Sequence, residues 1–279
     1  MGRLADLLAS GKPVLWIEAT AYAERLMANG KVSWCNAAEV DAWHRKAQGL
    51  LKSDIVALPL ASGAEAWRQA DEELAAEMAG KKRATAPLKI LLASEPLRAH
   101  IVEILKGLRA SYGSNPLALV VPSPRRWVGD AYAAAHGEKP EVGEDEADGA
   151  AMYVADFLRT FGESGIDVLL LEETTETAPA SAAEIKWYQS VFNIAAHYRW
   201  ESGLRIPVPR NSIAGAEGLD FCIAPEVVAG LATGLALSDA AWQSGEVPAL
   251  PQGGFRFVEV PLDAVPETAL EKLAQLRQG

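Results

Sequence analysis

The sequence predicts an α/β fold, a single-domain (β/α)8 barrel of the TIM type. The chain has 279 residues, and roughly 250 residues form such a barrel. Eight short apolar runs alternate with helical patterns, and most of the runs are continuously apolar, as in parallel strands covered on both faces. A doubly wound open sheet is the alternative. No G-x-G-x-x-G or G-x-x-x-x-G-K-[ST] motif follows a run to favour it.

The elements are expected in the following order. Strands are predicted over 13–18, 54–60, 88–93, 117–122, 167–172, 204–209, 219–224 and 255–260. Helices are predicted over 37–52, 64–80, 96–110, 150–162, 180–201, 226–236 and 264–277. The helix at 64–80 has a regular apolar stripe, formed by Ala66, Trp67, Ala70, Leu74 and Met78. The last helix has acidic residues near its first turn, which suits the positive end of the helix dipole.

No internal repeat or domain boundary is evident, so residues 1–279 are predicted to form one domain. The segment 138–148 (EKPEVGEDEAD) is acidic and poor in apolar residues, and it is interpreted as a mobile surface loop. A lid over a site is one role open to such a loop.

Composition narrows the possible partners. The formal charge is −11, so nucleic acid and anionic membranes are not expected as partners. No stretch approaches the roughly 20 apolar residues of a membrane-spanning helix, and the first residues lack a signal-peptide pattern. The two cysteines are expected to be reduced thiols. These observations predict a cytoplasmic protein that acts on a small molecule, and they leave a homodimer open.

Polar side chains at the ends of the apolar runs are the first candidates for a site, because the carboxyl ends of barrel strands form the active-site face. Carboxylates there can move protons where burial raises their pKa. Arginines there can hold a substrate carboxylate through their planar guanidinium group. The candidates at or after these ends are Glu18, Glu172, Glu173, Glu226, Arg125, Arg126 and Arg210. Trp16 and Trp127 lie near strand ends and could line an apolar pocket.

The histidines and cysteines do not have the spacing of a transition-metal site, and no G-x-S-x-G elbow is present. No metal or cofactor is therefore expected.

Two segments resemble enzyme families of one barrel superfamily. Ser53–Gly63 (SDIVALPLASG) resembles the S-D-I-x-x-x-P-x-A-x-G segment of uroporphyrinogen decarboxylases. Residues 161–173, which end in two glutamates, resemble the substrate-binding segment of cobalamin-independent methionine synthases. The first resemblance implies a catalytic role for Asp54 and places Tyr132 near the decarboxylase tyrosine.

The preferred hypothesis is a cofactor-independent, decarboxylase-type lyase acting on a small carboxylate-bearing, cyclic or aromatic molecule. Glu172, with Glu18 or Asp54, would carry out acid/base chemistry. The substrate would be held by Arg125, Arg126, Arg210, Trp16, Trp127, Tyr132 and Glu226. Two alternatives remain: a folate- or corrinoid-linked methyltransferase of the methionine synthase-like group, and a non-catalytic ligand-binding barrel.

Overall fold

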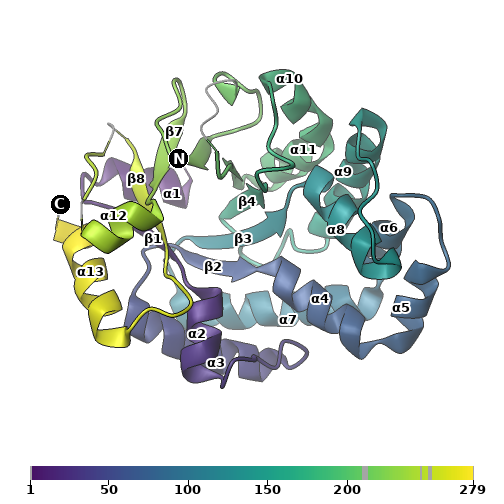
Figure 1. Cartoon of the computed structure of the whole chain (residues 1–279), viewed down its shortest axis with the longest axis horizontal. Helices are drawn as coiled ribbons and strands as arrows, with labels where there is room; N and C mark the ends of the chain where they lie inside the picture. The colour runs from purple at the N-terminus through teal and green to yellow at the C-terminus, as the bar shows by residue number, and fades with distance from the viewer. Residues whose placement is uncertain (1, 209–212, 246, 251–252, 279) are drawn as a thin grey trace.

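Eight parallel strands form a nearly closed barrel, which confirms the predicted fold (Figure 1). The computed structural model describes residues 2–208, 213–245, 247–250 and 253–278. The strands are hydrogen-bonded in the order β1-β8-β7-β6-β5-β4-β3-β2. Their bounds are β1 Leu15–Glu18, β2 Val56–Pro59, β3 Leu117–Pro122, β4 Val168–Glu172, β5 Glu201–Arg205, β6 Phe221–Ala224, β7 Ala232–Ala236 and β8 Phe255–Glu259.

Helices surround the barrel, with α2, α3 and α7 below the strands in Figure 1 and α12 and α13 on the left. The helices are α1 Arg3–Ala9, α2 Thr20–Met27, α3 Ala37–Leu51, α4 Leu60–Ala70, α5 Glu72–Ala79, α6 Ala86–Ala93, α7 Glu95–Tyr112, α8 Pro124–His136, α9 Glu144–Arg159, α10 Ala182–Ile185, the 3-10 turn η1 Lys186–Tyr188, α11 Gln189–Tyr198, α12 Asp239–Ser244 and α13 Pro266–Gln278. No described helix is long and apolar enough to cross a bilayer.

Two element predictions are wrong: one predicted strand is a helix, and part of one predicted helix is a strand. The total of eight strands is therefore unchanged. Residues 88–93 were expected to form a strand but lie in α6, whose buried Leu88, Leu91 and Leu92 have helical spacing. A short apolar run does not distinguish a strand from a buried helix. Residues 226–236 were expected to form a helix, yet their second half is β7. Gly230, with φ of 81°, lies in the connection before this strand.

Other predicted boundaries are shifted. The helix expected over 64–80 is divided at Asp71, which caps the N-terminus of α5 by accepting a hydrogen bond from the backbone N–H of Leu74. The strand expected over 204–209 is β5, which ends at Arg205. The acidic segment 138–148 is a loop only as far as residue 143, because its remaining residues begin α9. Acidic side chains in that first turn suit the helix dipole.

Aromatic side chains fill the interior of the barrel. Trp16 packs on Phe221, Phe255 and Phe257, with ring centroids 6.1–6.3 Å apart. Two strand glycines make room for the rings, since a Cβ on Gly203 would lie 2.1 Å from Phe221 and one on Gly234 would lie 2.4 Å from Phe255. The absence of a side chain at these two positions therefore allows the large rings to occupy the barrel axis.

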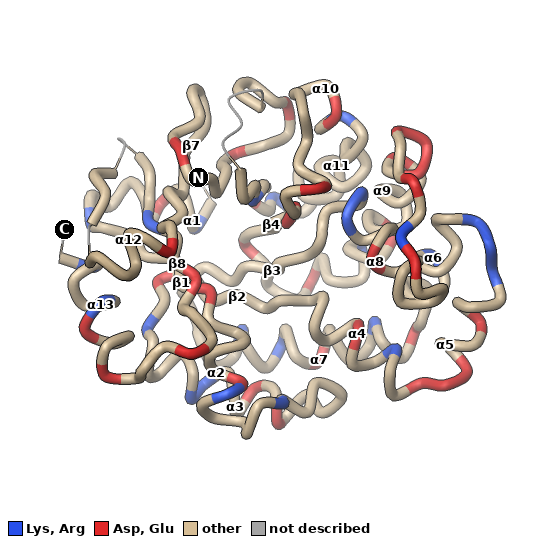
Figure 2. Tube along the Cα trace, in the orientation of Figure 1, with Lys and Arg blue, Asp and Glu red and all other residues tan. Residues whose placement is uncertain are grey.

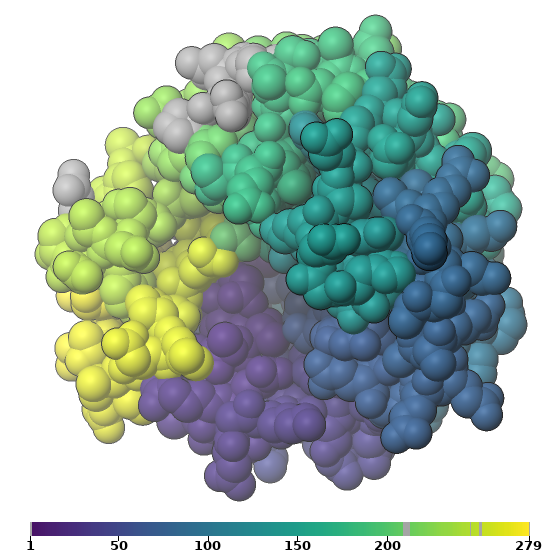
Figure 3. Space-filling model, turned by 45° about the vertical axis from the view of Figure 1, so that its right-hand side comes forward, coloured from purple at the N-terminus to yellow at the C-terminus, as the bar shows by residue number. Residues whose placement is uncertain are grey.

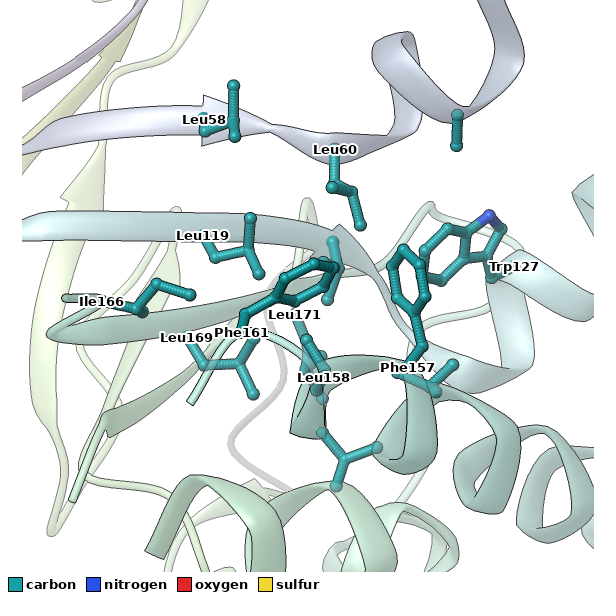
Figure 4. Packing of buried hydrophobic residues seen from close by; sticks show 14 of the residues in the cluster. Leu58, Leu60, Leu119, Trp127, Phe157, Leu158, Phe161, Ile166, Leu169 and Leu171 are labelled. Carbon is teal, nitrogen blue, oxygen red and sulfur yellow. The ribbon is translucent and has the colours of Figure 1, made fainter. Parts of the chain in front are cut away.

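The amino-terminal end of the barrel is closed by α1. Leu4 belongs to the interior cluster, and the backbone N–H groups of Leu4 and Ala5 each donate to the Glu201 carboxylate at 2.8 Å. A carboxylate at the first turn of a helix satisfies N–H groups that have no partner within the helix. A second apolar layer lies outside the barrel, between strands and helices; Figure 4 shows Leu119 and Leu171 in this layer.

The first and last strands of the sheet order, β1 and β2, meet at a seam. No strand ladder joins them, and β1 is instead hydrogen-bonded to Ser53 and Asp54, which precede β2. The Leu15 N–H donates to the Asp54 carboxylate at 2.8 Å, the Asp54 N–H donates to Leu15 O at 3.0 Å, and the Ile17 N–H donates to Ser53 Oγ at 3.0 Å. Asp54 thus links β1 to the start of β2 at the amino-terminal end of the barrel.

Candidate active site

A cavity of about 610 Å³ opens at the carboxyl ends of the strands. In Figure 3 it is the recess between the purple amino-terminal segment, the yellow carboxy-terminal segment and the teal middle of the chain. Glu18, Glu172, Arg205 and Glu259 line it, and each is the last residue of its strand. In Figure 2 the red of acidic residues appears beside the labels of β1, β8 and β4. The cavity therefore occupies the usual active-site face of a (β/α)8 barrel.

Arg205 connects two acids across the mouth of the barrel. Its Nη1 lies 2.8 Å from Glu172 Oε1 on the neighbouring strand, and its Nη2 pairs with Glu259 on β8. The guanidinium also lies 4.8 Å from the ring centroid of Phe257. Burial alone would lower the pKa of Arg205, but Glu172 and Glu259 outweigh this effect and raise it. Arg205 is accordingly a fixed cation, each of whose two Nη atoms is engaged by a carboxylate.

Arg126 is the second guanidinium in the cavity, and it is less tightly held. It lies in the first turn of α8, where the N-cap Ser123 accepts a hydrogen bond from its backbone N–H. Its Nη1 is 3.5 Å from Glu172 Oε2, and its Nε is 3.3 Å from Asp130 Oδ2. Both distances exceed those of a strong charge-assisted hydrogen bond. Arg126 is therefore available to turn toward an anionic ligand.

Glu18 is a partly buried carboxyl group in the cavity wall. Its Oε1 accepts a hydrogen bond from the Thr20 N–H at 2.9 Å. Burial raises the pKa of Glu18 above its ordinary value, and the nearby charges of Glu259 and Glu172 raise it further against the effect of Thr20. Glu18 thus has the environment of a carboxylic acid that can retain its proton.

Glu173 is a second candidate acid, and it is more deeply buried. The hydroxyl group of Tyr188 donates to its Oε1 at 2.5 Å, and its Oε2 has no hydrogen-bond partner among the described residues. Burial raises the pKa of Glu173 to about 7, against hydrogen bonds that include the one from Tyr188. The residue follows β4 and contributes to the cavity wall beside Glu172.

This environment predicts a pH-dependent stability. The folded state holds the Glu173 proton up to about pH 7, whereas the unfolded chain releases it near pH 4.5. Stability is therefore expected to fall as pH rises from 4.5 through 7, by about 3 kcal/mol. Glu173→Gln keeps an acceptor for Tyr188 and should remove most of this loss. Urea unfolding of both proteins at pH 5 and pH 8 measures it, and an equal loss in the variant would contradict the assignment.

Aromatic and aliphatic side chains form the floor of the cavity. Trp16 and Phe257 rise from the interior cluster, and Val120 and Leu170 lie beside them. A flat apolar floor under a charged rim suits a ring that carries a charged substituent.

The structure brings five of the sequence-predicted residues to this cavity: Glu18, Glu172, Glu173, Arg126 and Trp16. Asp54 lies before β2, at the opposite end of the barrel, where its carboxylate binds the Leu15 N–H. The strand register explains this difference, because Asp54 precedes the strand while the other acids end theirs.

The other predicted residues that the structure describes do not line the cavity. Arg125 pairs with Glu184 at 2.9 Å and lies over the ring of Trp187. Trp127 points into the outer apolar layer against Phe157 (Figure 4). Tyr132 packs on His136 farther along α8. Glu226 is exposed in the connection between β6 and β7. Arg210 lies outside the described residues.

Sequence reasoning missed Arg205 and Glu259 as site residues. Arg205 falls inside the run expected as 204–209, so its place at the end of β5 was hidden by the shifted boundary. A single arginine between Leu204 and Ile206 is the signal that could have revealed it. The described residues contain no group of three or more His, Cys, Asp or Glu side chains arranged to hold a metal ion.

Comparisons with known proteins identify no family. No protein-family profile and no curated protein matches the chain. Among solved structures, the chain is similar to the tryptophan synthase alpha subunit of Legionella pneumophila str. Paris, with 12% identity, a TM-score of 0.44, and coverage of 100% of this chain and 98% of that one. It is also similar to the homocysteine methyltransferase MmuM of Escherichia coli, in its apo form, with 13% identity, a TM-score of 0.49 and coverage of 98% and 99%.

A third similar structure is the dihydrodipicolinate synthase of Bacillus clausii, with 8% identity, a TM-score of 0.40 and coverage of 98% of this chain and 76% of that one. Likenesses at this level concern the fold, so any activity has to be argued from the cavity itself.

Proposed function

We propose that this protein is an enzyme, a cofactor-independent lyase of the decarboxylase type that acts on a small cyclic molecule bearing a carboxylate. The observation that carries this proposal is the combination of a carboxylic acid with a raised pKa, Glu18, and a loosely held guanidinium, Arg126, in one cavity. Decarboxylation needs a cation to orient the carboxylate and an acid to protonate the carbon left behind.

The electrostatics of the mouth support this assignment of roles. Arg205 and Arg126 together balance the two negative charges of Glu172 and Glu259, which reduces the repulsion that these acids exert on an incoming anion. Within the described parts of the chain, the side chain of Arg126 makes two long contacts with carboxylates, and a substrate carboxylate can displace Glu172 from it. We assign substrate binding to Arg126 and assign to Arg205 the positioning of Glu172 and Glu259.

The reaction balances without a cofactor. The bond between the ring carbon and the carboxylate carbon breaks, carbon dioxide leaves, and the electron pair stays on the ring carbon. That carbon takes a proton from Glu18, which is then restored from solvent. The floor formed by Trp16 and Phe257 supports the ring while the carboxylate rotates out of its plane.

Deuterium incorporation tests this function. The purified protein is incubated in D₂O with a panel of aromatic and heteroaromatic carboxylates, and carbon dioxide release is followed together with NMR of the product. We expect one deuterium at the carbon that carried the carboxylate and no requirement for an added methyl donor. Turnover that depends on a folate or corrinoid methyl donor would instead favour methyl transfer. Binding without turnover across the panel would favour a ligand-binding barrel.

A further inference from the structure

The lining of the cavity extends beyond the mouth and includes residues from both sides of the barrel wall at the β1–β2 seam. Trp16, Ile55 and Ala57 face the barrel interior, whereas Ile17 and Leu51 belong to an apolar cluster outside it. All five line the same cavity. A hydrogen-bonded sheet separates its two faces, and β1 and β2 are the neighbouring strands that no ladder joins, so the seam is the opening available to a cavity lined from both faces.

At the seam, a side chain supplies a hydrogen bond to the strand backbone where a neighbouring strand is missing. His44 on α3 lies with Nε2 3.1 Å from the carbonyl oxygen of Ala57, and its Nδ1 lies 2.8 Å from the Tyr112 hydroxyl. Because a carbonyl only accepts, Nε2 carries the proton and donates to Ala57. Burial lowers the pKa of His44, which keeps the ring neutral. The imidazole thus binds a strand carbonyl at the unpaired edge of β2.

The lining of the seam is largely apolar. Trp43, Ala47 and Leu51 contribute from α3, and Ile55 and Ala57 contribute from β2. Gln48 Nε2 already donates to the Ser53 carbonyl at 2.6 Å. These side chains offer no charge to a ligand. They favour a hydrocarbon group.

Size also indicates a ligand larger than a single ring. The cavity measures about 610 Å³. A cavity of about 150 Å³ is enough to hold benzene. A ring with one carboxylate would therefore leave most of the cavity empty.

We infer that the seam between β1 and β2 is a second compartment, which takes an unbranched apolar arm of the substrate whose charged ring lies at the mouth. This inference rests on the proposed function for the charged end. The arm would pass between the strands toward α3, with Ala47 and Ala57 contributing the smallest apolar side chains of this lining. A leucine at either position would fill the path.

A chain-length series tests the compartment. Benzoate and 4-n-alkylbenzoates of increasing length serve as probes in isothermal titration calorimetry. Each added methylene that enters the seam is expected to tighten binding about fourfold until the compartment is full. Ala47→Leu and Ala57→Leu should abolish this gain while leaving benzoate affinity within about twofold. The exposed Ala38 on the same helix provides the matched control, since Ala38→Leu should keep the full gain.

The outcomes separate this inference from the function on which it rests. An unchanged affinity along the series, or a gain that persists in both leucine variants, would overturn the compartment. If a leucine variant loses benzoate binding or its folded circular dichroism spectrum, Ala47→Val replaces it with a smaller added volume. If benzoate itself does not bind but the length-dependent gain disappears in Ala47→Leu, the compartment stands and the carboxylate proposal at the mouth fails.

Discussion

Glu18→Gln is expected to lower kcat by about 10²- to 10⁴-fold, because the amide has a similar shape but supplies no acidic proton. The Thr20 N–H retains its acceptor in the variant, so the local backbone should be unchanged. Benzoate affinity should stay within a few-fold, which separates a loss of proton transfer from a loss of binding. Steady-state kinetics with the substrate found in the D₂O panel, combined with calorimetry, measure both quantities.

The same role of Glu18 predicts how the activity depends on pH. Burial raises the pKa of Glu18, and the acid form is the form that donates the proton. Activity should therefore fall as pH rises through that raised pKa, and Glu18→Gln should lose this limb of the profile. Glu173→Gln should keep it. The exposed Glu226 offers a matched control, since Glu226→Gln should retain the parent kcat and profile. A Glu18→Gln enzyme with full turnover would remove Glu18 from the chemistry.

The fold could be predicted because buried parallel strands leave a strong pattern. The run 117–122 matches β3 residue for residue, and all six of its residues are buried. The wrong predictions occur where the same apolar pattern is compatible with both a strand and a buried helix. Residues 88–93 are apolar enough for a strand, but Pro87 and the spacing of the buried leucines fit a helix. The predicted number of strands is still eight, because the strand wrongly predicted at 88–93 is offset by β7, which lies where a helix was predicted over 226–236.

The candidate site could be predicted only where a polar residue visibly ends an apolar run. Glu172 follows four buried apolar residues, and Glu18 ends a run of similar character. Arg205 could not be placed in this way because its strand begins at Glu201, in a stretch expected to be the end of a helix. The tertiary contact of Arg205 with Glu259 joins strands more than fifty residues apart, and no local pattern encodes it.

The adjacent arginines provide a sharp test, since Arg125 pairs with Glu184 on α10 whereas Arg126 contacts Glu172 in the cavity. Arg126→Ala is expected to raise the KM of the carboxylate substrate, and to weaken benzoate binding, by about 10- to 100-fold, because a charged hydrogen-bonding partner is lost. Arg126→Lys should recover only part of this loss, since lysine keeps the charge but not the planar pair of donors.

Arg125→Ala is the matched control, one residue away on the same helix. Its guanidinium pairs with Glu184 and lies against Trp187, outside the cavity lining. Removing it should cost at most about 1 kcal/mol of stability and leave KM within about twofold, because partly exposed ion pairs contribute little. Thermal unfolding and substrate kinetics on both variants decide the matter. An Arg125→Ala variant that loses binding as strongly as Arg126→Ala would show that the substrate approaches from the α10 side of the mouth, and the assignment of Arg126 alone would fail.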